Sequence, residues 1–340
     1  MQVLAGDIGG TKALLALVEV EASAPGTAPR ARVVESRRYD SHAHPGLESI
    51  CRAFAADLGR PLPKRAGFGI AGPVLEGRSV ATNLPWVTDA RDLKARLGAE
   101  QVVLVNDFVA LGQGLAYVEA NELLALNEGV RVAGGLVAVL GAGTGLGEAL
   151  VLTDRAGVRE VLPTEGGHAS FSPRDEVEIG LLRFLLTRHE HVSWERLLSG
   201  DGLLNIAEGL AAHGRLKLPV ALAEKLDADR SSCPAVVTDL ARRGDPLCQK
   251  ALQTFCSLYG AEAGNLALKS LPTGGIFVAG GIAPRITAEL ADGRFREAFL
   301  GKGRMRDLLT SIPVHVVLDP LTPLYGSAAL AAMAPASLST

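Results

Sequence analysis

The sequence lacks most features that mark membrane, secreted or nucleic-acid-binding proteins. No uncharged apolar run in its 340 residues approaches the length of about 20 residues that a membrane-spanning helix needs. The formal net charge is only −3, whereas nucleic acids and anionic membrane surfaces attract strongly basic faces. We therefore expect an enzyme acting on small molecules, with no nucleic-acid partner and no membrane partner.

Cysteine is scarce and scattered. The four cysteines, Cys51, Cys233, Cys248 and Cys256, contain no CxxC pair, which disfavours both a disulfide framework and a structural zinc site. The first predicted strand begins at Val3, which leaves no room for a signal peptide. These observations predict buried thiols in a cytoplasmic protein.

The two commonest phosphate-binding motifs are also missing. No stretch supplies the P-loop pattern GxxxxGK followed by Ser or Thr. The segment 141–145 carries part of a dinucleotide-binding pattern, but the residues after Gly147 continue as a strand and do not open a helix. A nucleotide site in this chain must therefore be of another kind.

Two glycine-rich turns with flanking apolar runs are present instead. The first is Gly6-Asp7-Ile8-Gly9-Gly10-Thr11-Lys12, and the second is Gly141-Ala142-Gly143-Thr144-Gly145-Leu146-Gly147. Both predict a β-hairpin, because apolar runs of strand length lie on either side. The glycines can adopt positive φ or let backbone approach a ligand closely, so the N–H groups of such a turn can surround a phosphate.

Asp7 has a separate expected role in the first turn. A carboxylate cannot bind phosphate directly, but it can help to hold Mg²⁺, by direct contact or through water. For the first turn alone, a simple reversal of the chain explains the pattern equally well. The second copy favours a duplicated fold whose two halves bind one nucleotide.

The length suits two domains of ordinary size, and a hydrophobic content of 48% predicts a large packed interior. After the first hairpin, the patterns predict strands at 31–39, 66–71 and a buried strand at 101–105, with helices at 45–58, 89–97 and 108–118. The second half predicts strands at 158–162, 275–279 and 314–318. It also predicts helices at 175–189, 247–271 and 325–333, with helices over 193–214 interrupted at Gly200 and Gly202. We expect domains at 1–118 with 319–340, and at 119–318.

Five motifs occur in order along the chain: 6–11, 105–108, 141–147, Glu165-Gly166-Gly167-His168, and Val278-Ala279-Gly280-Gly281. Together they resemble the bacterial glucokinase family of the hexokinase and actin-like superfamily, over essentially the whole chain. The resemblance implies an α/β protein of two domains with a duplicated actin-like (ribonuclease H-like) fold and an interdomain cleft. It further implies glucose as acceptor and a homodimer. ATP and Mg²⁺ would be bound by Gly6, Asp7, Ile8, Gly9, Gly10, Thr11, Gly143, Thr144, Gly280 and Gly281.

Asp107 is the candidate catalytic base. It follows a predicted parallel strand, and ligand crevices open at the carboxyl ends of such strands. Its carboxylate could accept the proton of a sugar hydroxyl during phosphoryl transfer. An N-cap of the following helix is the alternative role, and the family resemblance favours the base.

The segment 165–168 places a carboxylate and an imidazole three residues apart, with two glycines that let the turn direct both into one pocket. A carboxylate can accept hydrogen bonds from two neighbouring hydroxyls. By resemblance, the sugar hydroxyls would be bound by Asn106, Glu165, His168 and Glu195 beside Asp107. From the sequence alone, Glu195 is more typical of a solvated helix position.

One detail separates this chain from zinc-bearing sugar kinases and repressors, whereas a second, Lys12, is a residue that those relatives often have as well. Those relatives have cysteines after the equivalent histidine, but residues 169–173 contain none, so we expect no zinc. Lys12 stands where many close glucokinases have asparagine. It either contacts a nucleotide phosphate or faces solvent.

Three further possibilities are weighed against a glucokinase. A sugar-sensing regulator needs a DNA-binding helical module, for which the few residues before Asp7 leave no space. A filament-forming or chaperone-type ATPase has no use for the predicted sugar residues. A kinase that uses another hexose, or polyphosphate in place of ATP, stays open.

Overall fold

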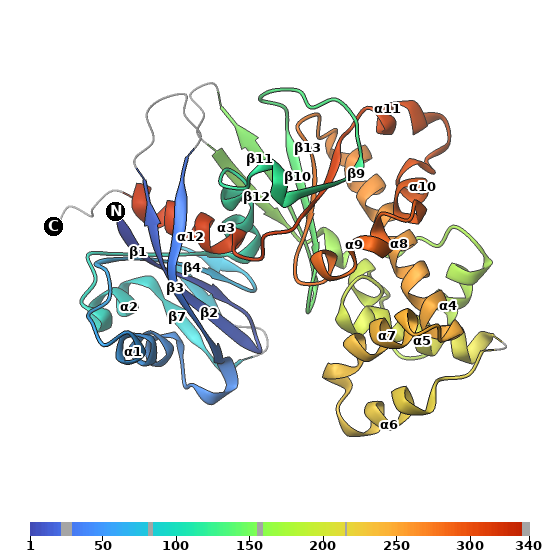
Figure 1. Ribbon diagram of the computed structural model, residues 1–340, viewed down its shortest axis with the longest axis horizontal. Helices are drawn as coiled ribbons and strands as arrows, with labels where there is room; N and C mark the ends of the chain where they lie inside the picture. Colours follow the sequence, from blue (N-terminus) through green and yellow to red (C-terminus); the bar gives the residue numbers. More distant parts are fainter. Residues whose placement is uncertain (22–28, 81–83, 155–158, 215, 335–340) are drawn as a thin grey trace. The chain divides into compact units, whose positions relative to one another are not determined.

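The computed structural model describes residues 1–21, 29–80, 84–154, 159–214 and 216–334 (Figure 1). These form two compact units. Unit 1 comprises Met1–Ala120, Val151–Pro163 and Asp319–Thr340, and unit 2 comprises Asn121–Leu150 and Thr164–Leu318. The domains expected from the sequence differ from these units mainly in the segment Val151–Pro163.

Unit 1 is built on a five-stranded sheet in the order β3-β2-β1-β4-β8. The strands are β1 (Gln2–Ile8), β2 (Lys12–Val20), β3 (Ala31–Asp40), β4 (Arg65–Ile70) and β8 (Gln101–Asn106). The first hairpin is confirmed, because β1 and β2 pair antiparallel. Since β1, β4 and β8 run parallel, the carboxyl ends of these three strands meet at one edge of the sheet.

Helices cover both faces of this sheet (Figure 1). α1 (Leu47–Leu58) and α2 (Ala90–Leu97) pack on one face, around Phe54 and Phe68. α12 (Thr322–Met333) packs on the other face and against α3 (Asp107–Gly114). A small sheet of β5 (Val74–Leu75), β6 (Arg78–Val80) and β7 (Val87–Asp89) completes the unit.

The predicted ends of α2 are confirmed. The Asp89 side chain accepts hydrogen bonds from the backbone N–H groups of Arg91 and Asp92 at the start of the helix. Gly98 ends the helix in the left-handed conformation, with φ of 62°. Both are the ordinary chemistry of helix termini.

Unit 2 contains most of a six-stranded sheet in the order β12-β11-β10-β13-β14-β9. The strands are β9 (Leu123–Asn127), β10 (Val137–Ala142), β11 (Leu146–Thr153), β12 (Arg159–Thr164), β13 (Gly275–Ala279) and β14 (Val314–Val317). β10, β13 and β14 are parallel, whereas β9 runs antiparallel at the edge. The end of β11 from Val151 and all of β12 except Thr164 belong to the segment that groups with unit 1.

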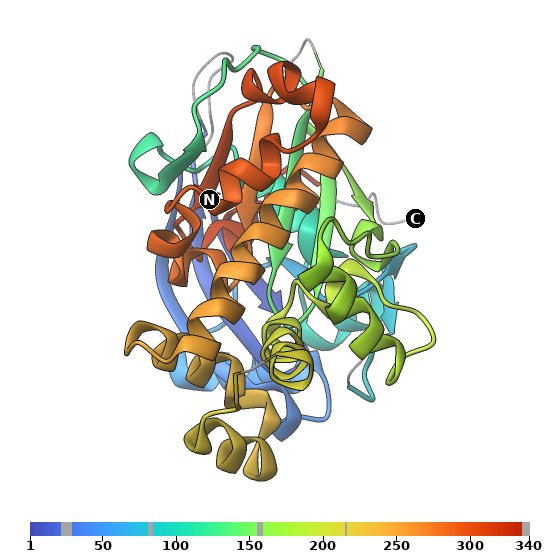
Figure 2. The same cartoon turned by 90° about the vertical axis from the view of Figure 1, so that its right-hand side faces the viewer.

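The long helix α8 (Pro246–Ser270) is the main support of unit 2 (Figure 2). It packs against β10 and buries most of its length in one apolar cluster. Around it lie α4 (Glu176–Leu186), α5 (Gly200–His213), α6 (Val220–Ala228), α7 (Cys233–Arg242), α9 (Thr287–Leu290), α10 (Arg294–Leu300) and α11 (Arg306–Thr310). No described helix is both long and apolar enough to span a bilayer.

The helices over 193–214 are a correction to the sequence-based expectation. They were expected to be interrupted at Gly200 and Gly202, but α5 begins at Gly200 and continues through Gly202. The Ser199 hydroxyl caps the helix by accepting the N–H of Gly202, 3.0 Å away. A side chain at Gly202 would collide with the backbone of Leu197. This glycine therefore allows close packing on Leu197 and does not interrupt the helix.

Several other predicted bounds or burial patterns also change. The helix expected at 175–189 ends at Leu186, and its inward face includes Glu178 while Val177 is 39% exposed. Glu178 can be buried there because it forms an ion pair with Arg174. The strand β8 lies at the edge of its sheet and is only partly buried. The helix expected at 108–118 ends at Gly114.

Close backbone packing holds α12 on the sheet of unit 1. A Cβ at Gly67 would lie 2.0 Å from the carbonyl oxygen of Ser327, which no local adjustment of a side chain can relieve. We expect Gly67→Ala to destabilise the protein by about 3 kcal/mol, at the upper end of the cost of overpacking. Urea unfolding measures this difference. Gly46→Ala is the control, because nothing lies within 4 Å of a Cβ there. Equal stability of the two variants would contradict the close contact.

Candidate active site

The tip of the first hairpin is tied down by hydrogen bonds. The Gly9 N–H donates to the Lys12 carbonyl at 3.0 Å, and the Ser41 hydroxyl donates to the Gly9 carbonyl at 2.9 Å. Neither Gly6 nor Gly9 adopts the left-handed conformation. Gly6 is required by packing, because a Cβ there would lie 2.5 Å from the Phe68 ring. The glycines of this turn thus act by close approach and not by positive φ.

Asp7 lies at the carboxyl end of β1, beside Gly69 of β4. Burial raises the pKa of its carboxyl group to about 6, and the nearby charge of Arg38 only partly opposes this. Within the described residues, the structure records no hydrogen bond to this carboxylate. A partly buried carboxylate that lacks hydrogen-bond donors fits a cation, and Mg²⁺ commonly binds through one carboxylate together with substrate phosphates.

Asn106 and Asp107 lie at the same edge of the sheet, at the end of β8 and the start of α3. Asn106 is the N-cap: its side-chain oxygen accepts the Phe108 N–H at 2.9 Å, and its amide donates to the Gly72 carbonyl at 3.1 Å. The capping role considered for Asp107 therefore belongs mainly to Asn106, although Asp107 Oδ1 also lies 3.0 Å from the Phe108 nitrogen.

The second predicted hairpin and the Gly280 turn come together in unit 2. The Gly143 N–H donates to the Gly145 carbonyl at 2.8 Å, which closes the turn between β10 and β11. Gly280 is left-handed, with φ of 82°, and a Cβ on it would lie 2.5 Å from the Ala142 carbonyl oxygen. A Cβ on Gly143 would lie 3.9 Å from the Gly281 nitrogen. The predicted nucleotide-binding residues of this unit are therefore neighbours.

The turn at 165–168 rests directly on β11. Residues Gly166–His168 form a short 3-10 helix, and Glu165 Oε2 lies 3.8 Å from His168 Nε2. A Cβ on Gly167 would lie 2.1 Å from the Leu146 carbonyl oxygen. The two glycines let the turn sit on the strand, while both predicted sugar-binding side chains stay largely exposed.

Glu195 is not the solvated helix residue that its sequence context suggested. It lies in the 3-10 helix Trp194–Arg196, and its Oε2 accepts the Leu146 N–H at 3.0 Å. A Cβ on Gly145 would lie 2.4 Å from that same oxygen. The third glycine of the second hairpin thus makes room for a predicted sugar-binding carboxylate.

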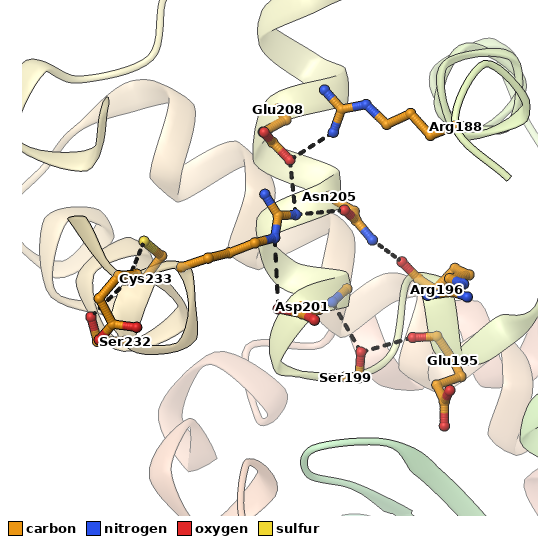
Figure 3. Close-up of polar contacts among 12 residues, drawn as sticks. Arg188, Glu195, Arg196, Ser199, Asp201, Asn205, Glu208, Ser232 and Cys233 are labelled. Atoms are coloured by element: carbon orange, nitrogen blue, oxygen red, sulfur yellow. Dashed lines mark hydrogen bonds and ion pairs between the residues drawn. The ribbon is translucent and has the colours of Figure 1, made fainter. Parts of the chain in front are cut away.

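The backbone of this short helix is anchored from α5 (Figure 3). The Ser199 hydroxyl donates to the Glu195 carbonyl at 2.8 Å, and the Asn205 amide donates to the Arg196 carbonyl at 2.9 Å. Arg230 in turn donates to the Asn205 side chain at 3.0 Å. These bonds hold the backbone at residues 195 and 196 and so fix the direction in which the Glu195 side chain points.

A cavity of about 370 Å³ adjoins these side chains in unit 2. Ligand pockets commonly have volumes of about 300–1,000 Å³. The cavity is lined by His168, Arg188, His189, Glu190, His191, Ser193, Glu195 and Arg196. It contains two of the predicted sugar-binding residues and is polar enough to hold hydroxyl groups.

Sequence reasoning missed two buried residues that support the site. Tyr259 of α8 accepts the Ala142 N–H at 2.8 Å and donates to the Ala279 carbonyl at 3.3 Å, which ties together the ends of β10 and β13. Glu148 of β11 lies under the turn at 165–168. An acid inside the apolar run 148–152 was the available signal for Glu148.

The comparisons with known proteins agree with the motifs. A family profile described as Glucokinase matches residues 4–334. The chain belongs to the glucokinase family. A glucokinase of Nostoc punctiforme is 38% identical over 342 residues, covering 97% of this chain and 98% of its own. The crystal structure of a glucokinase from an Antarctic psychrotroph has a TM-score of 0.80 at 30% identity, covering 98% and 99% of the two chains.

A more distant structure shows the same fold. The glucokinase of Streptomyces griseus, of the ROK family, was crystallised with glucose and AMPPNP; it has a TM-score of 0.67 at 22% identity, covering 98% of this chain and 100% of its own. The expected actin-like α/β fold is confirmed by these likenesses. The expected class of enzyme is confirmed as well: this member of the glucokinase family is an ATP-dependent hexose kinase that phosphorylates glucose.

Zinc was not expected in this glucokinase. Within the part of the chain that the structure describes, no three His, Cys, Asp or Glu side chains are arranged to hold a metal ion. The four cysteines are buried and unpaired. The absence of zinc stays a prediction, which metal analysis of the purified protein tests directly.

The buried carboxylate of Asp7 is expected to lower the stability of the protein while it is required for activity. Its pKa rises from an ordinary 3.8 to about 6 on folding, so the folded state binds the proton more tightly than the unfolded state does. The stability that this proton contributes is fully present below pH 3.8 and is lost as the pH rises through 6. We expect Asp7→Asn to stabilise the protein at pH 7.5 by up to about 3 kcal/mol, since each pKa unit corresponds to about 1.4 kcal/mol. The gain should nearly vanish at pH 4, and kinase activity should be lost at both.

Denaturant unfolding at the two pH values measures this difference. Asp227→Asn, on the exposed side of α6, is the control and should change neither stability nor activity. A variant Asp7→Asn that is no more stable than the wild type at pH 7.5 would refute the cost assigned to the buried charge.

A side chain in place of Gly145 is expected to weaken sugar binding selectively. In Gly145→Ala the new methyl group displaces the Glu195 carboxylate, which is the end of a flexible side chain, so the fold should survive. We expect the KM for glucose to rise about tenfold, the size of one lost hydrogen bond to a charged group. Gly143→Ala, whose methyl group meets no atom closer than 3.9 Å, should leave the KM for glucose unchanged. Steady-state kinetics with each substrate varied in turn would separate the two outcomes.

Proposed function

We propose that Asp107 is the general base in transfer of the γ-phosphoryl group from ATP to the 6-hydroxyl of glucose. The observation that carries this assignment is the position of Asp107 as the first residue of α3, immediately beyond the parallel strand β8. The carboxylate accepts the hydroxyl proton while O6 forms its bond to the γ-phosphorus and the bond to the ADP oxygen breaks. The products are glucose 6-phosphate and ADP.

Glucose is held through its other hydroxyl groups by Asn106, Glu165, His168 and Glu195. Support comes from the pairing of Glu165 and His168 on one short turn and from the cavity that His168 and Glu195 share. Carboxylates and an imidazole can accept or donate several hydrogen bonds to neighbouring hydroxyls. The amide of Asn106 is already fixed by its bond to Gly72, which would orient it before sugar binds.

ATP is held by backbone groups of the two glycine hairpins and of the Gly280 turn. The residues assigned to it are Gly6, Asp7, Ile8, Gly9, Gly10, Thr11, Gly143, Thr144, Gly280 and Gly281. Asp7 supplies the carboxylate for Mg²⁺, directly or through water; the ion, when bound, neutralises phosphate oxygens. Lys12 is exposed, which is compatible with either of its expected roles.

The finer assignments depend on the family resemblance for the homodimer and glycolysis, and on charge, cysteine usage and the early first strand for the others. They comprise a cytoplasmic location, a role in glycolysis, a homodimer, and the absence of nucleic-acid and membrane partners. The buried, unpaired cysteines are in keeping with a reducing compartment. Polyphosphate as donor and other hexoses as acceptors are the alternatives that an assay must compare.

Removal of the base should stop the chemistry and spare binding. We expect Asp107→Ala to lower kcat by at least about 10³-fold and to change the Kd for glucose by less than about tenfold, because a base acts mainly in the transition state. A coupled assay with ATP or polyphosphate and a panel of hexoses measures the first effect. Trp194, next to Glu195, offers a fluorescence signal for the second.

The matched control is Asp89→Asn. Asp89 likewise stands at the N-terminal end of a helix, as its N-cap, and asparagine can replace it there, so this variant should keep full turnover. A variant Asp107→Ala with near-normal kcat would remove Asp107 from the base role.

A further inference from the structure

Two buried glutamates lie together beneath the turn at 165–168. Glu148 of β11 is 3% exposed and Glu262 of α8 is fully buried. Their carboxyl groups lie within hydrogen-bonding reach of each other. One oxygen of each, Glu148 Oε1 and Glu262 Oε1, is buried without a hydrogen-bond partner among the described residues. Neither residue belongs to a motif already assigned to sugar or nucleotide.

The other oxygen of Glu148 supports the turn. A Cβ on Gly166 would lie only 2.0 Å from Glu148 Oε2, so the Cα of Gly166 rests against this oxygen. The Gly166 N–H donates to the Thr164 hydroxyl at 3.2 Å, and this hydroxyl lies 3.4 Å from the Glu148 carbonyl. The turn that carries Glu165 and His168 therefore packs directly on the Glu148 carboxyl group.

One proton between the two carboxyl groups would supply the hydrogen bond that Glu148 Oε1 lacks. Two interacting buried carboxylates do not both ionise readily, so one keeps a proton and donates it to the other. Burial first, and Glu262 second, raise the pKa of Glu148 to about 7. The charge belongs on Glu262, since the Asn265 amide donates to Glu262 Oε2 at 2.7 Å and Lys269 Nζ lies 3.7 Å from Glu262 Oε1.

The other ionisable groups around the pair favour the same assignment. Lys302, between α10 and α11, faces Glu262 and lowers the pKa of that carboxyl group against the effect of burial. Tyr259 of α8 faces Glu148. Burial raises the pKa of its hydroxyl far above neutrality, against the opposing hydrogen bond from the Ala142 N–H and with a further contribution from the charge of Glu148. Tyr259 therefore stays neutral, and the pair titrates between one negative charge and two.

We propose that Glu148 is a positioning residue for sugar binding: protonated, it donates to Glu262 and holds the turn at 165–168 so that Glu165 and His168 face glucose. The proposal rests on the assignment of Glu165 and His168 to the sugar. When Glu148 loses its proton, two negative charges share one buried site, and their repulsion displaces the carboxyl group that supports Gly166. Glucose affinity should then fall as the pH rises above neutrality.

The variant Glu148→Gln tests this directly, because glutamine keeps the shape of the protonated acid and can donate to Glu262 at every pH. We expect the wild-type KM for glucose to rise about fivefold or more between about pH 6.5 and 8.5. The KM of Glu148→Gln should match the wild type at the lower pH and stay flat to the higher one. The ratio of the two KM values cancels any effect of pH common to both proteins.

Glu148→Ala provides a second variant. It removes the support of Gly166 altogether and should raise the KM for glucose at all pH values, with kcat and the KM for ATP changed by less than about threefold. Glu48→Gln is the control, because Glu48 lies on α1 of unit 1, pairs with Arg52 and Arg96, and does not belong to the charged groups around Glu148 and Glu262. It should keep the wild-type pH profile of KM.

Two outcomes would overturn the proposal: a Glu148→Gln profile parallel to that of the wild type, or an unchanged KM for glucose in Glu148→Ala. Failure of the underlying assignment has a different signature. If Glu165→Gln and His168→Ala leave the KM for glucose unchanged, the turn does not bind sugar. If those two variants raise the KM while Glu148→Gln follows the wild type, the sugar assignment stands and Glu148 has no positioning role.

Discussion

The candidate site depends on glycines whose backbone is packed so closely by other protein atoms that no β-carbon would fit. Such packing occurs where Gly280 meets the Ala142 carbonyl, where Gly167 meets the Leu146 carbonyl, and where Gly145 meets the Glu195 carboxylate. Each contact leaves less than the space of a methyl group. The glycines of the motifs thus act largely as contacts between segments of the protein, and only Gly280 among these three needs positive φ.

The carboxyl groups of this kinase lie in different electrostatic settings, which suits them to different tasks. Burial raises the pKa of Asp7 and Glu148, but the two differ in what can relieve the cost of ionisation. Asp7 is partly exposed and has no recorded hydrogen bond to its carboxylate among the described residues, whereas Glu148 faces a second acid, Glu262. Asp107 stands at the N-terminus of α3, in a third kind of setting.

Much of the fold could be predicted from local sequence patterns. Features that depend on contacts between residues far apart in the chain could not. The first hairpin, the caps of α2 and the parallel strand β13 follow from residues close in sequence, whose turn and strand preferences agree with the fold. The place of Glu195 could not be derived in this way, because it depends on the N–H of Leu146, far away in the chain. The pair of Glu148 and Glu262 was missed for the same reason, since two acids on different elements show no common spacing.

The final helix has a consequence for how the chain is made. α12 covers the face of the first sheet that includes Val3, Ala5 and Val18, and Arg65 donates to carbonyl groups at its end. That face stays uncovered on the ribosome until about 300 further residues have been added, on the order of 15–60 s at ordinary rates of synthesis. The first unit to emerge is therefore the last to be complete, and its exposed apolar strands are a natural substrate for chaperones during translation.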